Sequence, residues 1–486
     1  MYRNAFLIMT ACLLSVSVMA QKDTTKQSIN ITSSYKPVLR NAVKINFSGS
    51  QLLADTSTTV KPYIIPAQNL FYAYQPIALK PLALQQDSNL YLGGRNFVKV
   101  GFGNYTTPYA KAALGFGDGK TYLVNFYGSY ISSKGKIRNQ DYAQFDAKAT
   151  GSYFGKKTEF YATASWSRHD YHLYGYDHAI YDYKRSEVKQ YLQSITLKAG
   201  VRNTNVSEFR INYNPNIEVN LFSNIEKLNE TNLIVDLPVE KKFGESFALK
   251  VAAKADITNY TTKGYIPNNY TVNNNVIQVS PSVQYSTAKL SINGGIIPTW
   301  DNNKFSMLPN VYAEYQLKEK VFMIQAGWVG RINKNNYRNL SSMNPYLATI
   351  TSQTNTKEVE FYGGIKASLG KHFNFNAKAG VVRYDNLPFF INDTATDGKA
   401  FIIANEPTVN NFRVHGDISY ISQEKFTATA GVTFNGYTGM DVNARAWNTV
   451  PVEITGSLRW WAFKQLMLKA DFYMFGGGNY LDKGNL

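Results

Sequence analysis

Three of the five histidines lie close together in the sequence, and imidazole nitrogen is a common metal ligand. They are His169, His172 and His178, in the stretch RHDYHLYGYDH. The alternative interpretation is a surface loop rich in tyrosine and aspartate, which needs no metal. We expect this second arrangement, and we expect no resident metal or other cofactor.

Other residues that could do chemistry are sparse. Cys12 is the only cysteine, and the stretch DTATDG at 393–398 lacks the regular ligand spacing of a calcium loop. Catalysis requires a nucleophile beside a base, or paired acids in a defined cleft. Acids such as Asp146 and Asp417 are more simply explained as partners of lysines in the same pattern. We therefore expect no enzyme.

The N-terminus has the features of an export signal. Arg3 precedes an apolar run from Ala5 to Val18, and Val18-Met19-Ala20 provides a small-residue cleavage site. Lipidation at Cys12 is the alternative, but the apolar run continues beyond it. The sequence thus predicts a signal peptide at 1–20 and an exported chain.

The rest of the chain is predicted to form β-strands, because apolar residues recur at every second position. In FALKVAAKADIT (247–258) the apolar positions alternate with Lys250, Lys254 and Asp256. From Phe97 onward about 19 such stretches follow, each near the ~9–11 residues that cross a bilayer at a tilt. A propeller or solenoid would show a fixed repeat length, whereas the hairpin period here varies.

Short and long connections alternate along these stretches. Tight links such as 155–157 and 370–371 lie between longer segments at 168–189, 259–275, 331–357 and 384–410. This is the pattern of an antiparallel up-and-down transmembrane β-barrel, which we expect over 95–486. Prolines 238, 281, 309 and 451 fit poorly inside its strands.

In such a barrel the apolar face meets outer-membrane lipid and the polar face lines the lumen. The alternation predicts a mixed, moderately basic lining, and with it part of the +17 formal charge. Because this charge is spread along strands rather than gathered in a patch, we expect no nucleic-acid partner. The predicted lining residues are Lys99, Lys148, Lys198, Arg202, Arg210, Lys250, Lys254, Asp256, Lys366, Lys378, Arg413, Asp417, Arg459 and Lys469.

The last residues, 476–486, are glycine-rich and lack a strand pattern. Single-chain bacterial barrels have even strand numbers. We therefore expect that C-terminal strands are missing and that the full barrel has about 22 strands, the number found in plugged outer-membrane transporters. A miscounted strand followed by a frayed tail is the alternative.

Residues 21–94 differ from the barrel region, because prolines space their apolar residues and favour extended backbone. The stretches SSYKPVLRNAVKIN (33–46) and PAQNLFYAYQPIALKPLAL (66–84) resemble the N-terminal region of Bacteroidota outer-membrane barrels related to TonB-dependent receptors. The resemblance implies a large outer-membrane barrel and uptake of a bulky nutrient. This chain departs from TonB-dependent receptors because 21–94 is too short for their globular plug.

Two functions follow from these features. The first is a transport channel or receptor-like uptake protein for a small molecule or a glycan, in the bacterial outer membrane. The alternative is a non-transporting structural or assembly component with a periplasmic or outer-membrane protein partner. We expect Pro66–Leu84 to dock at the periplasmic mouth or inside the barrel, although a disordered linker is the alternative.

Overall fold

Antiparallel strands form nearly all of the fold, as the alternating sequence predicts. The computed structural model describes residues 96–481 except 206, 263–269, 319–320, 371, 423–424 and 464–465. All of these residues belong to one unit, Ile65–Leu486. The predicted signal peptide and the extension at 21–94 lie outside the described residues.

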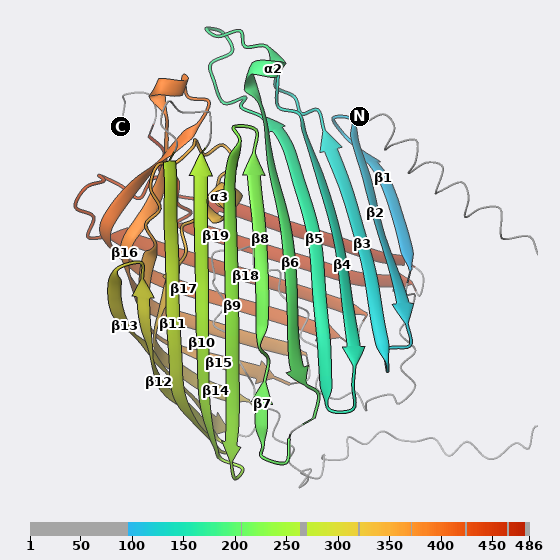
Figure 1. The fold of residues 1–486 in the computed structure, drawn as a ribbon, viewed down its shortest axis with the longest axis vertical. Helices are drawn as coiled ribbons and strands as arrows, with labels where there is room; N and C mark the ends of the chain where they lie inside the picture. The colour runs from blue at the N-terminus through green and yellow to red at the C-terminus, as the bar shows by residue number, and fades with distance from the viewer. Residues whose placement is uncertain are drawn as a thin grey trace, which may run out of the picture. The chain divides into compact units, whose positions relative to one another are not determined.

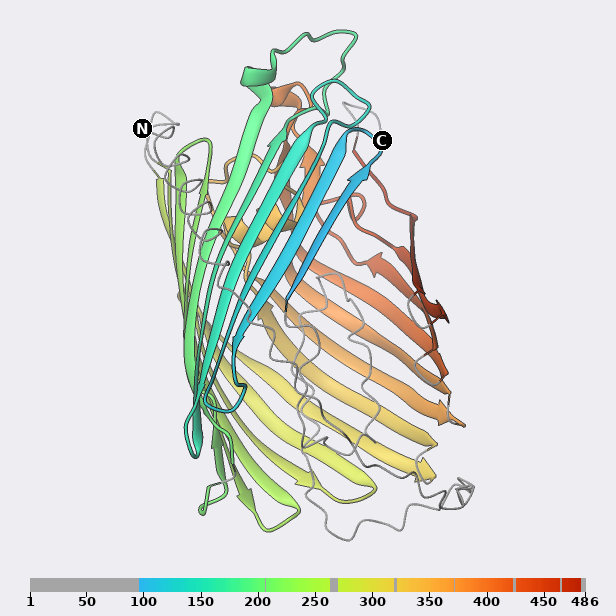
Figure 2. The same cartoon turned by 90° about the vertical axis from the view of Figure 1, so that its right-hand side faces the viewer.

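Twenty strands form a single sheet (Figures 1 and 2). Their bounds are β1 Phe97–Gly103, β2 Thr107–Gly117, β3 Tyr122–Ser133, β4 Tyr142–Phe154, β5 Thr158–His172, β6 Lys189–Asn203, β7 Ile211–Tyr213, β8 Asn216–Asn224, β9 Leu228–Phe243, β10 Phe247–Thr262, β11 Tyr270–Ser286, β12 Leu290–Asp301, β13 Lys304–Lys318, β14 Phe322–Asn333, β15 Thr356–Leu369, β16 Phe373–Asn392, β17 Phe401–Ser422, β18 Phe426–Thr438, β19 Val452–Phe463 and β20 Leu466–Gly476. Three short helical turns accompany them: α2 Arg185–Val188, α3 Tyr337–Met343 and η2 Thr394–Thr396. No helix among the described residues is long and apolar enough to span a membrane.

The strands pair in an up-and-down order, which confirms the predicted antiparallel β-barrel fold. β7 and β8 both pair with β9 in one continuous register, Tyr213 opposite Val239 and Asn216 opposite Asp236. They are two parts of one interrupted strand, so the sheet has the 19 strands that the alternation predicts. Among the described strands, β1 pairs only with β2, and β20 only with β19.

Of the four prolines that fit the alternation poorly, Pro238, Pro281 and Pro309 lie inside strands and Pro451 precedes β19; two of them face an interruption of the ladder. Pro238 in β9 faces the break between β7 and β8, and Pro281 in β11 lies where pairing with β12 lapses between Gln278 and Ser282. Proline has no N–H to donate to the neighbouring strand. Where the ladder is interrupted, no carbonyl of the neighbouring strand is left waiting for that hydrogen bond. Proline is therefore compatible with these strands.

The four predicted long connections are all shorter than expected, and those that remain longest are 173–188, between β5 and β6, and 334–355, between β14 and β15. The expected loop 384–410 is mostly strand, because β16 and β17 remain paired as far as Asn392 opposite Phe401. Likewise β10 continues to Thr262 and β11 begins at Tyr270. Backbone pairing satisfies the N–H and C=O groups there even though the apolar alternation has ended.

Candidate functional site

The two faces of each strand have different environments, as β10 shows. Leu249 and Val251 are large apolar side chains, yet each is 40% exposed. At the alternate positions Thr258 is fully buried, and Lys250 lies 3.7 Å from Glu240 of β9. The sheet therefore exposes its apolar face and packs its polar face.

Most charged residues predicted for the polar face have an oppositely charged partner. Asp417 accepts a hydrogen bond from Asn376 Nδ2 at 2.9 Å, and its carboxylate lies 3.3 Å from His415 Nε2. Lys99, Lys148, Lys254 and Arg459 lie on strands and are exposed. Five more of the predicted residues form ion pairs with acids on strands: Lys198–Glu218 (3.4 Å), Arg202–Glu159 (2.7 Å), Lys366–Glu314 (2.6 Å), Lys378–Glu360 (2.9 Å) and Lys469–Asp471 (2.8 Å).

Arg210 does not lie on a strand. It precedes β7 with a φ of 53°, and its Nη1 donates a hydrogen bond to Gly244 O at 2.7 Å. A positive φ is incompatible with extended strand backbone. The predicted strand position of Arg210 is therefore wrong, and the residue belongs to a turn.

Residues 334–355 connect β14 to β15, and we call them the crossing segment. The sequence predicts a long loop here. Instead of extending away from the sheet, the segment folds inward. In both views its helix α3 lies on the concave side of the curved sheet, between strands that face one another (Figures 1 and 2). Asn336 caps α3, because its side chain accepts a hydrogen bond from the backbone N–H of Asn339.

Glu230 of β9 attaches the crossing segment to the sheet. Its side chain is buried and accepts hydrogen bonds from the backbone N–H of Tyr337 at 2.8 Å and from Asn336 Nδ2 at 2.7 Å. Arg338 N at 3.3 Å and Gln353 Nε2 at 3.1 Å complete the set. A buried carboxylate is tolerated when such donors satisfy it. Glu230 thus holds both the beginning and the end of the segment.

An ion pair fixes the first residue of the crossing segment. Lys334 Nζ lies 2.5 Å from Asp256 Oδ1 and donates to the backbone O of Asp256 at 2.6 Å. Burial lowers the pKa of Lys334, and the charge of Asp256 opposes that shift. Asp256, which the alternation placed on the polar face, therefore contacts the crossing segment.

Amide side chains fix the other end of the segment. Asn355 Nδ2 donates to Asn274 Oδ1 at 2.7 Å and to Asp301 Oδ1 at 2.6 Å, and Asn274 Nδ2 donates back to Asn355 Oδ1 at 2.9 Å. Asn274 and Asn355 are buried. The segment is thus fixed to β10 where it begins and to β11 and β12 where it ends.

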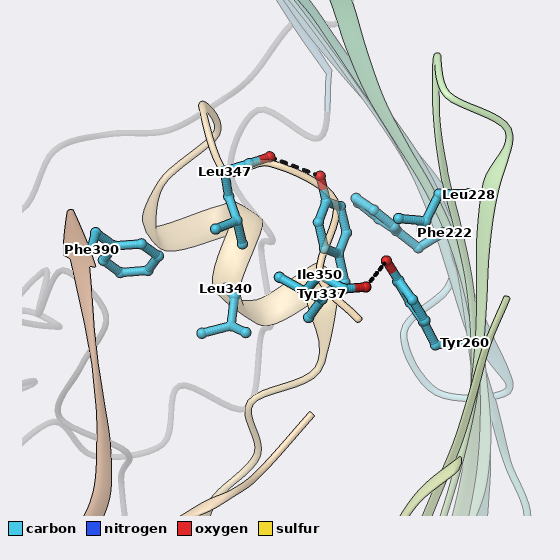
Figure 3. Packing of buried hydrophobic residues seen from close by; sticks show 8 residues of the cluster. All are labelled: Phe222, Leu228, Tyr260, Tyr337, Leu340, Leu347, Ile350 and Phe390. Carbon is cyan, nitrogen blue, oxygen red and sulfur yellow. Dashed lines mark hydrogen bonds between the residues drawn. The ribbon is translucent and has the colours of Figure 1, made fainter. Parts of the chain in front are cut away.

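An apolar cluster fills the space between these anchors (Figure 3). Tyr337 of α3 packs beside Tyr260, which donates a hydrogen bond to Ile350 O at 2.8 Å. Tyr337 in turn donates to Leu347 O at 3.0 Å, and burial raises its pKa. The remaining members of the cluster are Phe222, Leu228, Leu340 and Phe390.

The crossing segment also contacts distant strands. Phe390 of β16 joins the same cluster, and Ala348 N donates to Phe401 O of β17 at 2.8 Å. The hydroxyl of Tyr171, in β5, donates to Pro345 O. Six strands, β10 to β15, separate β9 from β16, so the segment joins parts of the sheet that are not neighbours.

A charged cluster lies on the strands that flank the crossing segment. Glu358 of β15 is buried between Arg331, whose Nε donates to it at 2.9 Å, and Arg413, whose Nη1 lies 3.5 Å away. Arg413 also donates to the hydroxyl of Tyr384. The positive charge predicted at Arg413 is thus compensated by a buried acid.

A cavity of about 190 Å³ lies between the crossing segment and the β16–β17 hairpin. Its polar lining includes Asn335, Thr349, Ser352 and Asn405, and its apolar lining includes Ile402. Hydroxyl and amide groups could hydrogen-bond a neutral polar molecule.

Residues 439–451, between β18 and β19, form a second segment with the same kind of anchor. Glu406 of β17 is fully buried and accepts hydrogen bonds from the backbone N–H groups of Asp441 at 2.7 Å, Val442 at 3.0 Å and Asn443 at 2.7 Å. Trp447 of this segment packs in a cluster with five residues of β16 and β17: Val382, Tyr384, Leu387, Phe389 and Val409.

The three clustered histidines have separate partners. His172 Nδ1 lies 3.0 Å from Asp141 O, His178 Nε2 lies 3.0 Å from Tyr174 O, and His169 packs against aromatic rings. Across the described part of the chain, no group of three or more histidine, cysteine or acidic side chains is arranged to hold a metal.

The sequence did not reveal Glu230 or Glu406 as anchors. Both precede their partners by many residues, Glu230 by 106 from Asn336 and Glu406 by 35 from Asp441. The only local signal is polarity, because Asn229-Glu230-Thr231-Asn232 interrupts the apolar pattern of β9.

The paired strands and the packed polar face define an antiparallel β-barrel. No family model matches the sequence, and no curated protein matches it. Among solved structures, the siderophore receptor PirA from Pseudomonas aeruginosa is similar at a TM-score of 0.55 and 11% identity, covering 76% of this chain and 67% of PirA. The FrpB iron transporter from Neisseria meningitidis (F3-3 variant) has a TM-score of 0.57 and 10% identity, covering 78% and 67%.

A mutant of the ferric enterobactin receptor PfeA from Pseudomonas aeruginosa is also similar, with a TM-score of 0.56, 11% identity, and coverage of 76% of this chain and 65% of PfeA. By name these neighbours are a siderophore receptor, an iron transporter and a ferric enterobactin receptor. At such identities the likeness shows the barrel fold that they share with this chain.

Proposed function

We propose that this chain is a bacterial outer-membrane barrel that transports a solute through its lumen, in the manner of a TonB-dependent-receptor-like uptake protein. The observation that carries the proposal is the division of the sheet into an exposed apolar face and a packed, ion-paired polar face. Lipid would cover exposed apolar side chains such as Leu249 and Val251. Contact of these side chains with water would be unfavourable. The polar face would then line the lumen.

In this proposal the predicted charged residues of the strands line the transport path, and the substrate is a small molecule or a glycan. The solved neighbours named for siderophores and iron support a transport role through their shared fold. Residues 21–94 would act as an extension at the periplasmic side or within the lumen, where a protein partner could also bind. The chain would not act as an enzyme.

The refolded full-length protein in planar bilayers tests transport. We expect discrete current steps, with larger or more frequent steps once residues 21–94 are removed. A membrane that stays sealed with both proteins, although both are inserted, would contradict transport and favour the structural role.

A pair of substitutions tests the orientation of the strands. Val251→Arg should destabilise the barrel in detergent by about 2–4 kcal/mol if position 251 lies near the bilayer midplane, because it places a charge on the lipid face. Lys250→Gln should cost little. Equal losses in urea titrations would show that the assigned faces are reversed.

A further inference from the structure

The crossing segment is fixed at several well-separated points of the sheet. Glu230 of β9 and Asp256 of β10 hold its first residues, and Phe401 of β17 hydrogen-bonds its later residues. Tyr171 of β5 reaches it from a third direction. A chain of 22 residues, 334–355, that contacts strands so far apart in the sheet must cross the space that they enclose.

Among these contacts, those of Glu230 are concentrated on the segment. All four of its hydrogen-bond donors, on Asn336, Tyr337, Arg338 and Gln353, belong to the crossing segment. Loss of the carboxylate would leave the Tyr337 amide and the Asn336 and Gln353 amide groups buried without their acceptor. Buried donors that lose an acceptor are costly, so the free energy required to detach the segment from the sheet would fall.

We infer that the crossing segment is a size-selecting constriction of the lumen and that Glu230 is the residue that positions it. The inference rests on the proposed transport function and adds to it the element that limits the size of the solute. A solute that enters the lumen must pass beside 334–355, whose position is set from β9. Glu230 is a positioning residue, because its contacts are with the segment rather than with the solute.

Thiol labelling tests the position of the segment without reference to transport. Ser341 is 1% exposed, so Ser341→Cys in a Cys12→Ser background places one thiol at a buried site of α3. Adding Glu230→Ala should make maleimide labelling of that thiol about tenfold faster or more, because several buried hydrogen bonds are lost. Glu230→Gln keeps one acceptor oxygen and should give an intermediate rate.

Liposome swelling with a graded series of neutral sugars tests the constriction. Glu230→Ala should admit larger sugars than the wild type does, and Glu230→Gln should fall between them. Glu406→Ala is the matched control, because Glu406 is an equally buried acceptor of backbone amides whose donors belong to the 439–451 segment. Heat-modifiable migration on gels confirms that each variant forms a barrel.

Each outcome decides between the parts of the inference. Faster labelling together with a larger size limit supports it. Unchanged labelling overturns the positioning role of Glu230, and faster labelling with an unchanged size limit overturns the constriction. If labelling becomes faster but neither the wild type nor any variant makes liposomes permeable to a sugar, the transport function is overturned. The constriction, which rests on that function, is then overturned as well.

Discussion

The crossing segment and the 439–451 segment have the same anchoring chemistry but different reach. In each, a buried glutamate on a strand accepts hydrogen bonds from successive backbone amides, Glu230 from Tyr337 and Arg338, Glu406 from Asp441 to Asn443. A carboxylate without a paired cation is well solvated by such donors. The anchor therefore does not determine what a segment does.

Reach distinguishes the two segments. The strand residues of the cluster around Trp447 belong to β16, β17 and β18, which are neighbours in the sheet, so the 439–451 segment packs close to the strands that it connects. The cluster around Tyr337 combines residues of β8, β9, β10 and β16. A segment that joins distant strands can restrict a lumen, whereas one that packs on adjacent strands leaves it unchanged.

The largest effect should come from removing the segments. Replacing 338–352 with a short glycine-serine linker should raise single-channel conductance several-fold, because the chain that crosses the lumen is gone. Replacing 440–448 in the same way should leave conductance near that of the wild type. Equal increases from both deletions would remove the distinction between the segments.

A smaller effect is expected at the first anchor. Lys334→Met leaves Asp256 without its cation, and we expect the free energy of opening of the crossing segment to fall by about 2–3 kcal/mol. The cost is below that of a fully unpaired buried charge because Asn232 still donates to Asp256 at 2.6 Å. Hydrogen exchange of the 334–355 amides measures the change, and the same exchange should be unaltered in Lys250→Met.

The smallest effect is a dependence on pH. Burial is the main cause of the raised pKa of Tyr337, and the nearby carboxylates Glu226 and Glu230 add to it. Because the folded pKa exceeds the ordinary value of 10.0, packing is fully retained below about pH 10 and weakens as the pH rises further. Conductance should therefore be flat from about pH 7 to 9 and rise above 10. In Tyr337→Phe the conductance should not rise above pH 10. If it rises as much as in the wild type, groups other than Tyr337 cause the pH dependence.

Much of the barrel was predictable because its strands obey a local rule. Alternation at positions such as 247–258 depends only on which face each residue occupies, and an apolar outward face recurs on strand after strand. The alternation also placed Lys250 and Asp256 on the face that the structure shows to be packed. The alternation placed Arg210 on a strand wrongly, because the apolar pattern does not indicate a turn residue with a positive φ.

The crossing segment was not predictable in the same way. Its stretch from Tyr337 to Met343 is a helix of seven residues, too short for a helical period to be recognised. The partners that bury it include Leu228 and Tyr260, which precede Tyr337 by 109 and 77 residues (337 − 228 and 337 − 260). A long polar connection in sequence is compatible with a surface loop, and only the tertiary contacts show that this one folds inward.

The direct test of the account compares the two anchors in one measurement, the single-channel conductance of Glu230→Ala and Glu406→Ala in planar bilayers under identical salt. Each substitution removes one buried carboxylate that accepts from a loop, so their local chemistry is matched. The account predicts a larger conductance than the wild type for Glu230→Ala and an unchanged conductance for Glu406→Ala. An equal change in both variants, or a change confined to Glu406→Ala, would contradict it.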